Sequence, residues 1–178
     1  MNESLIAARY AKALLNIGIE AQVLPQLRED LKLIDSTCRA EPRIQQVINS
    51  PSVLRETKLQ LLKQLFGGKV SPYTIRFAET LLQRNRQQLL PDILRSFEGL
   101  YNRHENIRQA VLTTASPVNE AQRQAVVRLL ETRYRAHIEL TCRINPDIIG
   151  GFVLNVDGDQ YDAAVETALR RIQQNLMQ

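Results

Sequence analysis

Hydrophobic residues in the first 105 positions recur at helical spacing, in six segments separated by short polar or proline-containing links. Apolar residues three and four positions apart lie on one face of an α-helix, so each segment is predicted to be a helix. The expected helices cover residues 4–20, 23–39, 42–49, 52–66, 71–86 and 89–104. Helices joined by short links are typical of a compact bundle, so residues 1–105 are expected to form a six-helix domain.

After Glu105 the hydrophobic period changes. Residues 107–115 are apolar and β-branched, which predicts a strand, and residues 117–134 are expected to form a helix capped at Ser116-Pro117. Residues 137–144 alternate between polar and apolar side chains, which predicts a strand. The alternation places one set on a single buried face: Ile138, Leu140, Cys142 and Ile144.

The stretch from Ile144 to Tyr161 turns at Asn145-Pro146-Asp147, because Pro146 has no backbone N–H and disfavours helix at the preceding residue. A further strand follows, with Gly150 and Gly151 inside it and a closing turn at Asp157-Gly158. A helix is expected from about Tyr161 to the end of the chain. The order β-α-β-β-α over residues 106–178 predicts a small α/β module, and the whole chain is expected to be a two-domain α+β protein.

The first predicted helix is apolar around most of its circumference. Its polar residues occupy one narrow stripe: Arg9, Lys12, Asn16 and Glu20. The remaining arc of roughly 240° is much wider than the 100° or so that one-sided packing requires. Such a helix either runs through the middle of its own bundle or packs on one side and receives a partner on another. Periodicity alone favours burial of this helix inside its own bundle, and binding of a partner on one side is the alternative interpretation.

Three separated stretches resemble one known family, in the right order and over nearly the whole chain. They are Ala8-Arg9-Tyr10-Ala11-Lys12-Ala13-Leu14, Leu89-Leu90-Pro91-Asp92-Ile93 followed by Phe97, and the run from Ile144 to Tyr161. Together they resemble the delta subunit of F-type ATP synthases, whose mitochondrial counterpart is the oligomycin sensitivity conferral protein. The run Arg84–Leu89 is longer than the family's usual pattern, which leaves the end of the fifth helix open.

The resemblance implies a non-catalytic stator subunit at the cytoplasmic face of a bacterial inner membrane, attached to the membrane only through the complex. It implies that residues 1–105 bind the N-terminal segment of the alpha subunit between the first and fifth helices, and that residues 106–178 bind the b subunits of the peripheral stalk. The helix match carries Tyr10, Ala13 and Leu14 as candidate groove positions. Periodicity adds Phe77 and Leu81 from the facing helix, although all five also fit an ordinary bundle core.

Composition narrows the functional classes further. The net charge of +4 lies entirely before Asn106, which favours an acidic partner for the N-terminal part. No apolar run approaches the roughly 20 residues needed to cross a bilayer, and the first residues lack a targeting pattern, so the protein is expected to stay on the side where it is made. Cys38 and Cys142 are expected to be reduced, mostly buried thiols.

The residues indicate neither a catalytic centre nor a cofactor or metal site. His104 and His137 have no ligand or nucleophile partners at the required spacing, and Asp157, Asp159 and Asp162 do not match a calcium loop. Two other classes stay open: an RNA-binding helical module using Arg84, Arg86 and Arg103, and an enzyme whose residues converge only in the fold. With 5% aromatic residues and a neutral C-terminal half, nucleic-acid binding is disfavoured.

Overall fold

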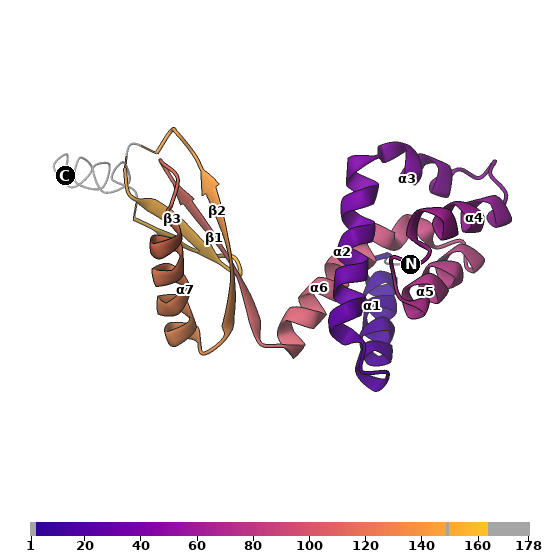
Figure 1. Cartoon of the computed structure of the whole chain (residues 1–178), viewed down its shortest axis with the longest axis horizontal. Coiled ribbons are helices and arrows are strands. Elements are labelled where there is room, and N and C mark those ends of the chain that lie inside the picture. Colours follow the sequence, from indigo (N-terminus) through magenta and orange to yellow (C-terminus); the bar gives the residue numbers. More distant parts are fainter. Residues whose placement is uncertain (1–2, 149, 164–178) are drawn as a thin grey trace. The chain divides into compact units, whose positions relative to one another are not determined.

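The structure is a computed structural model that describes residues 3–148 and 150–163 (Figure 1). The chain divides into two compact units, Met1–Tyr101 and Asn102–Gln178. Each unit has a hydrophobic core of its own. The described residues form seven α-helices and a four-stranded mixed sheet, which confirms the predicted α+β class.

Helices make up the first unit, and they lie close to the predicted ranges. They are α1 (Glu3–Glu20), α2 (Leu24–Ala40), α3 (Pro42–Asn49), α4 (Arg55–Phe66), α5 (Pro72–Gln83), the short 3-10 turn η1 (Gln87–Leu89) and α6 (Leu90–His104). The apolar stripe of α2 faces inward through Leu24, Leu27, Leu31, Ile34 and Cys38. The α2 stripe meets α3, α4 and α5 in one cluster that includes Ile44, Ile48, Leu62, Phe66 and Leu82. Apolar burial of this kind is the main source of stability for short helices.

A buried polar contact joins α2 to the beginning of α5. The carboxylate of Asp30 accepts hydrogen bonds from the backbone N–H of Ser71 and from the hydroxyl of Thr74, both at 2.7 Å. Ser71 is the N-cap of α5, and its hydroxyl accepts from the N–H of Thr74 at 3.3 Å. A carboxylate at a helix N-terminus is stabilised by the free N–H groups and the helix dipole. The start of α5 is therefore fixed against α2.

In the second unit α7 lies along one face of the sheet (Figure 1). Its elements are β1 (Ile107–Thr114), α7 (Glu120–Tyr134), β2 (His137–Ile144), β3 (Phe152–Val156) and β4 (Asp159–Asp162). The strand order is β2-β1-β3-β4, with β1 parallel to β2 and antiparallel to β3. Leu130 of α7 is buried against residues of β1, β2 and β3. The unit is thus two layers, one helix on one mixed sheet, over the residues that the structure describes.

The chain after Asp157 departs from the prediction. Residues Asp159–Asp162 form β4, antiparallel to β3, and not the first turn of a helix. Asp157 and Gly158 both have positive φ, 50° and 102°, which is the backbone of a two-residue hairpin turn. An Asp-Gly pair strongly favours that turn, and its twist returns the chain as a strand. The predicted helix beyond Ala163 lies outside the described residues.

Three predicted boundaries were also wrong. Ser116-Pro117 does not cap α7, because Asn119 and Gln122 form a reciprocal capping box three residues later. Ser52 does not cap α4, which begins at Arg55 without a side-chain cap. Gly150 and Gly151 precede β3 and are not inside it, since Gly151 has a φ of 85°, which an extended strand does not use.

The predicted buried face of β2 is only half buried. Ile138 and Leu140 are buried, but Cys142 is exposed and Ile144 is 58% exposed. The helix explains the difference, because Glu120 at the beginning of α7 lines the same groove as Thr141. Helix α7 therefore covers β2 as far as its middle and leaves the last residues of the strand bare. The expectation that both cysteines are mostly buried holds for Cys38 and fails for Cys142.

Candidate functional site

Helix α1 carries two adjacent apolar stripes, and only one of them is inside the unit. Ala7, Ala11, Leu14 and Gly18, spaced by four, three and four residues, are buried. The neighbouring set has the same spacing and lies at or near the surface: Ile6, Tyr10, Ala13 and Ile17. Ile17 is 43% exposed. The wide apolar arc of this helix is thus divided between core packing and an exposed strip, one helical position apart.

Close contact between α1 and α2 explains why the inner stripe has small residues. A Cβ atom placed on Gly18 would lie 2.8 Å from Leu24 Cδ1, 2.9 Å from Leu27 Cδ1 and 3.2 Å from the Leu24 Cα. These distances are shorter than van der Waals contact, so a larger residue there would require the side chains of Leu24 and Leu27, and to a smaller extent the backbone of Leu24, to shift. The inner stripe is therefore fully used by the fold, and it leaves the outer stripe free of that packing role.

The outer stripe continues onto α5 through an aromatic pair. The rings of Tyr10 and Phe77 meet edge to face, with centroids 6.5 Å apart and planes at 70°. Tyr73, one helical turn before Phe77, is 40% exposed. We call this surface the α1–α5 face, and it consists of Ile6, Tyr10, Ala13, Ile17, Tyr73 and Phe77. Aromatic and aliphatic side chains gathered between two helices are the usual lining of a groove that receives a third, amphipathic helix.

The five sequence-predicted residues divide into two groups. Tyr10 and Phe77 touch each other, and Ala13 is exposed on the same stripe. Leu14 and Leu81 lie in the interior, 1% and 2% exposed. Sequence reasoning missed Ile6, Ile17 and Tyr73. The signal for the first two was present, because Ile6, Tyr10, Ala13 and Ile17 repeat at the i, i+4, i+7, i+11 spacing of a helix face.

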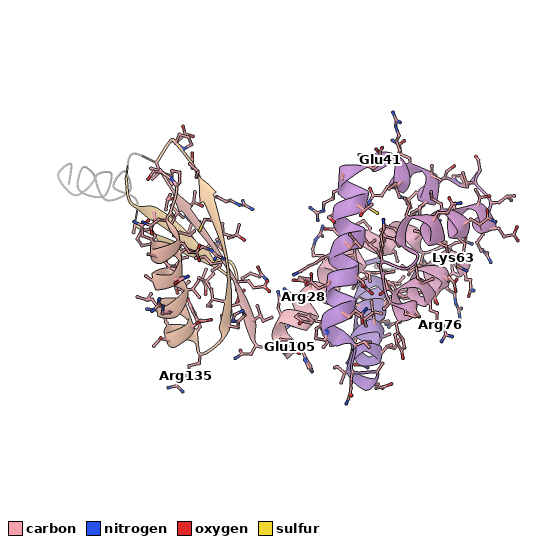
Figure 2. The ribbon with its side chains drawn as sticks, viewed as in Figure 1. Arg28, Glu41, Lys63, Arg76, Glu105 and Arg135 are labelled. Atoms are coloured by element: carbon pink, nitrogen blue, oxygen red, sulfur yellow. The ribbon has the colours of Figure 1, made fainter. Side chains whose placement is uncertain are left out.

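Basic side chains border the α1–α5 face. Arg9 of α1 and Arg76 of α5 are exposed, and Figure 2 shows Arg76 pointing away from the helices. Arg9 precedes Ala13 by one helical turn, and Arg76 adjoins Phe77 in sequence. An apolar surface with positive charges at its margin fits an amphipathic segment that carries acidic residues on its flanks.

The second unit has an apolar groove between α7 and the ends of β1 and β3. Its volume is about 710 Å³, and its lining includes Leu112, Val126, Leu129, Phe152 and Leu154. Leu129 is 65% exposed and Phe152 is 42% exposed. Exposed large apolar side chains beside one groove are typical of a protein-binding surface. The family resemblance implies a partner for this unit and indicates no residues that would bind it.

Neither surface, over the described residues, carries a cluster of side chains that could hold a metal ion. Among the described residues, no three His, Cys, Asp or Glu side chains gather where they could hold a metal ion. In the same part of the chain, no helix combines the length and apolar character of a membrane span. Both surfaces are instead lined mainly by apolar side chains, which bind by burial and shape.

Comparison with known proteins is consistent along the whole chain. The sequence profile of the ATP synthase delta (OSCP) subunit matches residues 6–176. The ATP synthase subunit delta of Cytophaga hutchinsonii is 31% identical over 172 residues, covering 97% of this chain and 94% of that protein. The subunit of the same name from Desulforamulus reducens is 30% identical over 177 residues, covering 99% and 98%.

A solved structure shares the fold. A chain in the cryo-EM structure of the Toxoplasma gondii mitochondrial ATP synthase hexamer superposes with a TM-score of 0.75 and 24% identity, covering 97% of each chain. The family profile and the bacterial relatives extend over both units, from α1 to beyond β4. This chain therefore belongs to the family of the ATP synthase delta (OSCP) subunit, a structural and not a catalytic subunit of that complex.

Proposed function

We propose that this protein is a stator subunit that links the alpha/beta catalytic head of a bacterial ATP synthase to the b subunits of its peripheral stalk. In this role it resists the torque of rotary catalysis, so that the head does not turn with the rotor. It has no reaction of its own and needs no cofactor. It is held at the cytoplasmic face of the inner membrane through the complex alone.

The α1–α5 face is the proposed site for the N-terminal segment of the alpha subunit. The observation that supports this best is the apolar stripe of Ile6, Tyr10, Ala13 and Ile17, which is half-buried to exposed and contacts α5 where the rings of Tyr10 and Phe77 meet. An amphipathic helix laid along it would bury these side chains without displacing the core. Leu14 and Leu81, which lie beneath the face, support its shape and do not touch the partner.

Contacts elsewhere in the unit hold this face in place before the partner arrives. Asp30 fixes the start of α5, and Gly18 allows α1 to approach α2. A binding surface that is already ordered loses little conformational entropy on binding, which favours the tight attachment that a torque-bearing link requires.

The groove of the second unit is the proposed site for the ends of the b subunits. Leu129 and Phe152 are the exposed apolar residues at its mouth. Helices of a stalk that end in apolar side chains would bury these residues, and the two attachments would then lie on separate units of one chain.

Titration calorimetry of the full chain with a synthetic peptide of the cognate alpha subunit's N-terminus tests the first attachment. Ala13→Asp should weaken binding by about 2–3 kcal/mol, because it places an unpaired charge in a desolvated contact. Ala8→Asp is the matched control, because Ala8 is also exposed on α1 but lies off the stripe. The affinity of this variant for the alpha peptide should be unchanged. Equal affinities for both variants and the parent chain would remove the α1–α5 face from the site.

Pull-down with the soluble part of the cognate b subunits tests the second attachment. Leu129→Glu should weaken b binding and leave binding of the alpha peptide intact, since Leu129 lines only the groove of the second unit. Gln124→Glu is the control, because it also introduces a glutamate on α7 but on another side of the helix. It should not change binding of the b subunits or of the alpha peptide. Loss of alpha binding with Leu129→Glu would contradict the assignment of separate sites.

A further inference from the structure

Lys58 is a buried lysine in the apolar stripe of α4. It is 6% exposed, and the next residues of its stripe, Leu62 and Phe66, belong to the core of the first unit. Within the part of the chain that the structure describes, no hydrogen bond or ion pair joins the Lys58 ammonium to another residue. Burial of a charge without a counter-charge costs free energy. The fold thus contains a positive charge to which the described residues supply no partner.

The ammonium nitrogen of Lys58 is nevertheless in contact with solvent. Among the described residues, the one side-chain nitrogen or oxygen that is both sealed from solvent and without a partner is Gln87 Oε1. The Lys58 nitrogen has no partner either, so it is not sealed. The long carbon stem of a lysine packs along apolar surface while its charged end extends to water. Lys58 therefore keeps its stem in the core and its charge where a solute can reach it.

The side chain of Lys58 is directed toward the beginning of α4. Side chains of an α-helix tilt toward its N-terminus and cover the preceding turn. Arg55, the first residue of α4, precedes Lys58 by three positions, so it lies on the same side of the helix and about 4.5 Å away along the axis. The extended side chain of a lysine is longer than that rise. The Lys58 ammonium is therefore aimed at the first turn of its own helix.

The first turn of α4 has backbone donors that the helix does not use. Its N-cap residue is Leu54, whose side chain has no oxygen and makes no capping bond. The first helical hydrogen bond runs from Lys58 N to Leu54 O at 3.1 Å. The three preceding N–H groups, of Arg55, Glu56 and Thr57, therefore have no partner within the helix. Free N–H groups and the helix dipole together favour an anion at this position.

The side-chain charges of this turn also favour an anion on the Lys58 side. Arg55 is exposed, and over the described residues it forms no ion pair. Glu56 is the acidic residue of the turn, but it is exposed and lies about 200° from Lys58 around the helix. The side of the turn that Lys58 faces thus has two cations, and the carboxylate of Glu56 lies on the other side.

We propose that the first turn of α4 binds a small oxyanion, held by the Lys58 ammonium and by the free N–H groups of Arg55, Glu56 and Thr57. An inorganic phosphate ion has acceptor oxygens for both kinds of donor, and bonds between charged partners are the stronger ones. An acidic side chain of a partner protein offers the same chemistry through its carboxylate. This inference goes beyond the proposed stator function and does not depend on it.

Amide chemical shifts of the full chain, measured by NMR as phosphate replaces chloride at constant pH and ionic strength, test the site. The amide signals of Arg55, Glu56 and Thr57 should shift together and reach saturation. Lys58→Met keeps the apolar stem and removes the charge, so it should raise the phosphate Kd about tenfold or more. Lys69→Met is the matched control, because it removes the same charge from an exposed lysine just after α4. Its phosphate Kd should equal that of the parent chain.

Circular dichroism and urea unfolding without phosphate show whether Lys58→Met is folded, and loss of an unpaired buried charge should leave its stability equal or higher. The mapping in the parent chain does not depend on that variant. Titration with acetate in place of phosphate separates the two sources of the oxyanion: preference for phosphate indicates the free ion, and equal affinity indicates a partner's carboxylate. Shifts that do not saturate, that appear equally at the first turns of α5 and α7, or that persist unchanged in Lys58→Met would overturn the proposal.

Discussion

Arg28 and Glu98 form an ion pair that joins α2 to α6. Arg28 Nη2 and Glu98 Oε1 are 2.5 Å apart, and Arg28 Nε donates to the same carboxylate at 3.1 Å. The Arg28 side chain, labelled in Figure 2, is 8% exposed. Its guanidinium lies 4.5 Å from the ring centre of Tyr101, also on α6. The arginine is thus held by a carboxylate and an aromatic face on one helix.

Replacement of the two partners should have unequal effects. Glu98→Ala removes the carboxylate that neutralises a buried guanidinium and should lower the free energy of unfolding by about 3 kcal/mol. Arg28→Met keeps most of the packing and leaves a carboxylate that is 33% exposed, so its loss should be smaller. Urea denaturation followed by circular dichroism measures both. The exposed pair Arg39–Asp35 provides the control, because Arg39→Ala should cost less than about 1 kcal/mol. Equal losses for Glu98→Ala and Arg39→Ala would show that burial of the first pair has no energetic consequence.

Two glycines in helices should respond in opposite directions to a larger side chain. Gly18→Val forces branched carbons against Leu24 and Leu27 and should destabilise the protein by about 2–3 kcal/mol. Gly99→Ala in α6 meets nothing within 4 Å and should stabilise it by about 0.5–1 kcal/mol, through helix propensity and the lower entropy of the unfolded chain. Thermal unfolding of both variants beside the parent chain measures the two shifts. Destabilisation by Gly99→Ala would contradict this account of open space around α6.

Periodicity was sufficient to predict the helices of the first unit, because the α2 stripe from Leu24 to Cys38 is also the stripe that the core buries. It was insufficient at helix ends, where one side-chain hydrogen bond decides the boundary. Ser52 and Ser116 are acceptable caps by residue type, yet α4 and α7 begin three and four residues beyond them. Asp157-Gly158 was recognised as a turn, but whether a helix or a strand follows depends on pairing with β3, which local sequence does not contain.

Asn119 offers a test of the observed cap against a predicted one. Its side chain accepts from Gln122 N at 2.8 Å, and Gln122 Oε1 accepts from Asn119 N at 3.0 Å. Asn119→Ala should therefore lower stability by about 1 kcal/mol, measured as the urea midpoint of the second unit. Ser52→Ala, at the position where sequence suggested a cap, should change stability by less than about 0.5 kcal/mol. The reverse order of the two effects would contradict the cap assignments.

The sequence predicted only part of the candidate site, and the reason is physical. A helical wheel shows which residues of α1 share a face, but it does not show which of two adjacent apolar faces meets the core. Leu14 and Ala13 are neighbours in sequence, and only Leu14 is buried, because Gly18 brings the inner stripe against α2. Packing of the whole unit was needed to separate them. The sequence predicts that α1 has more apolar surface than one-sided packing needs. It does not predict which of these apolar residues face the core and which remain at the surface.

The two cysteines should differ sharply in reactivity. Cys38 lies in the core of the first unit, where burial raises the pKa of its thiol and the nearby carboxylate of Asp35 raises it further. Since the thiolate is the reactive form, a maleimide at neutral pH should label the exposed Cys142 rapidly and Cys38 only after unfolding. Mass spectrometry of the Cys142→Ser variant isolates Cys38, and rapid labelling of that folded variant would contradict the placement of Cys38 in the core.

The raised pKa of the Cys38 thiol also determines how the stability of the protein depends on pH. The folded chain holds this proton more tightly, so its contribution is present below the ordinary thiol pKa of about 8.5 and is lost as the pH rises through the folded value. Cys38→Ala should therefore flatten the alkaline decline in the free energy of unfolding relative to the parent chain.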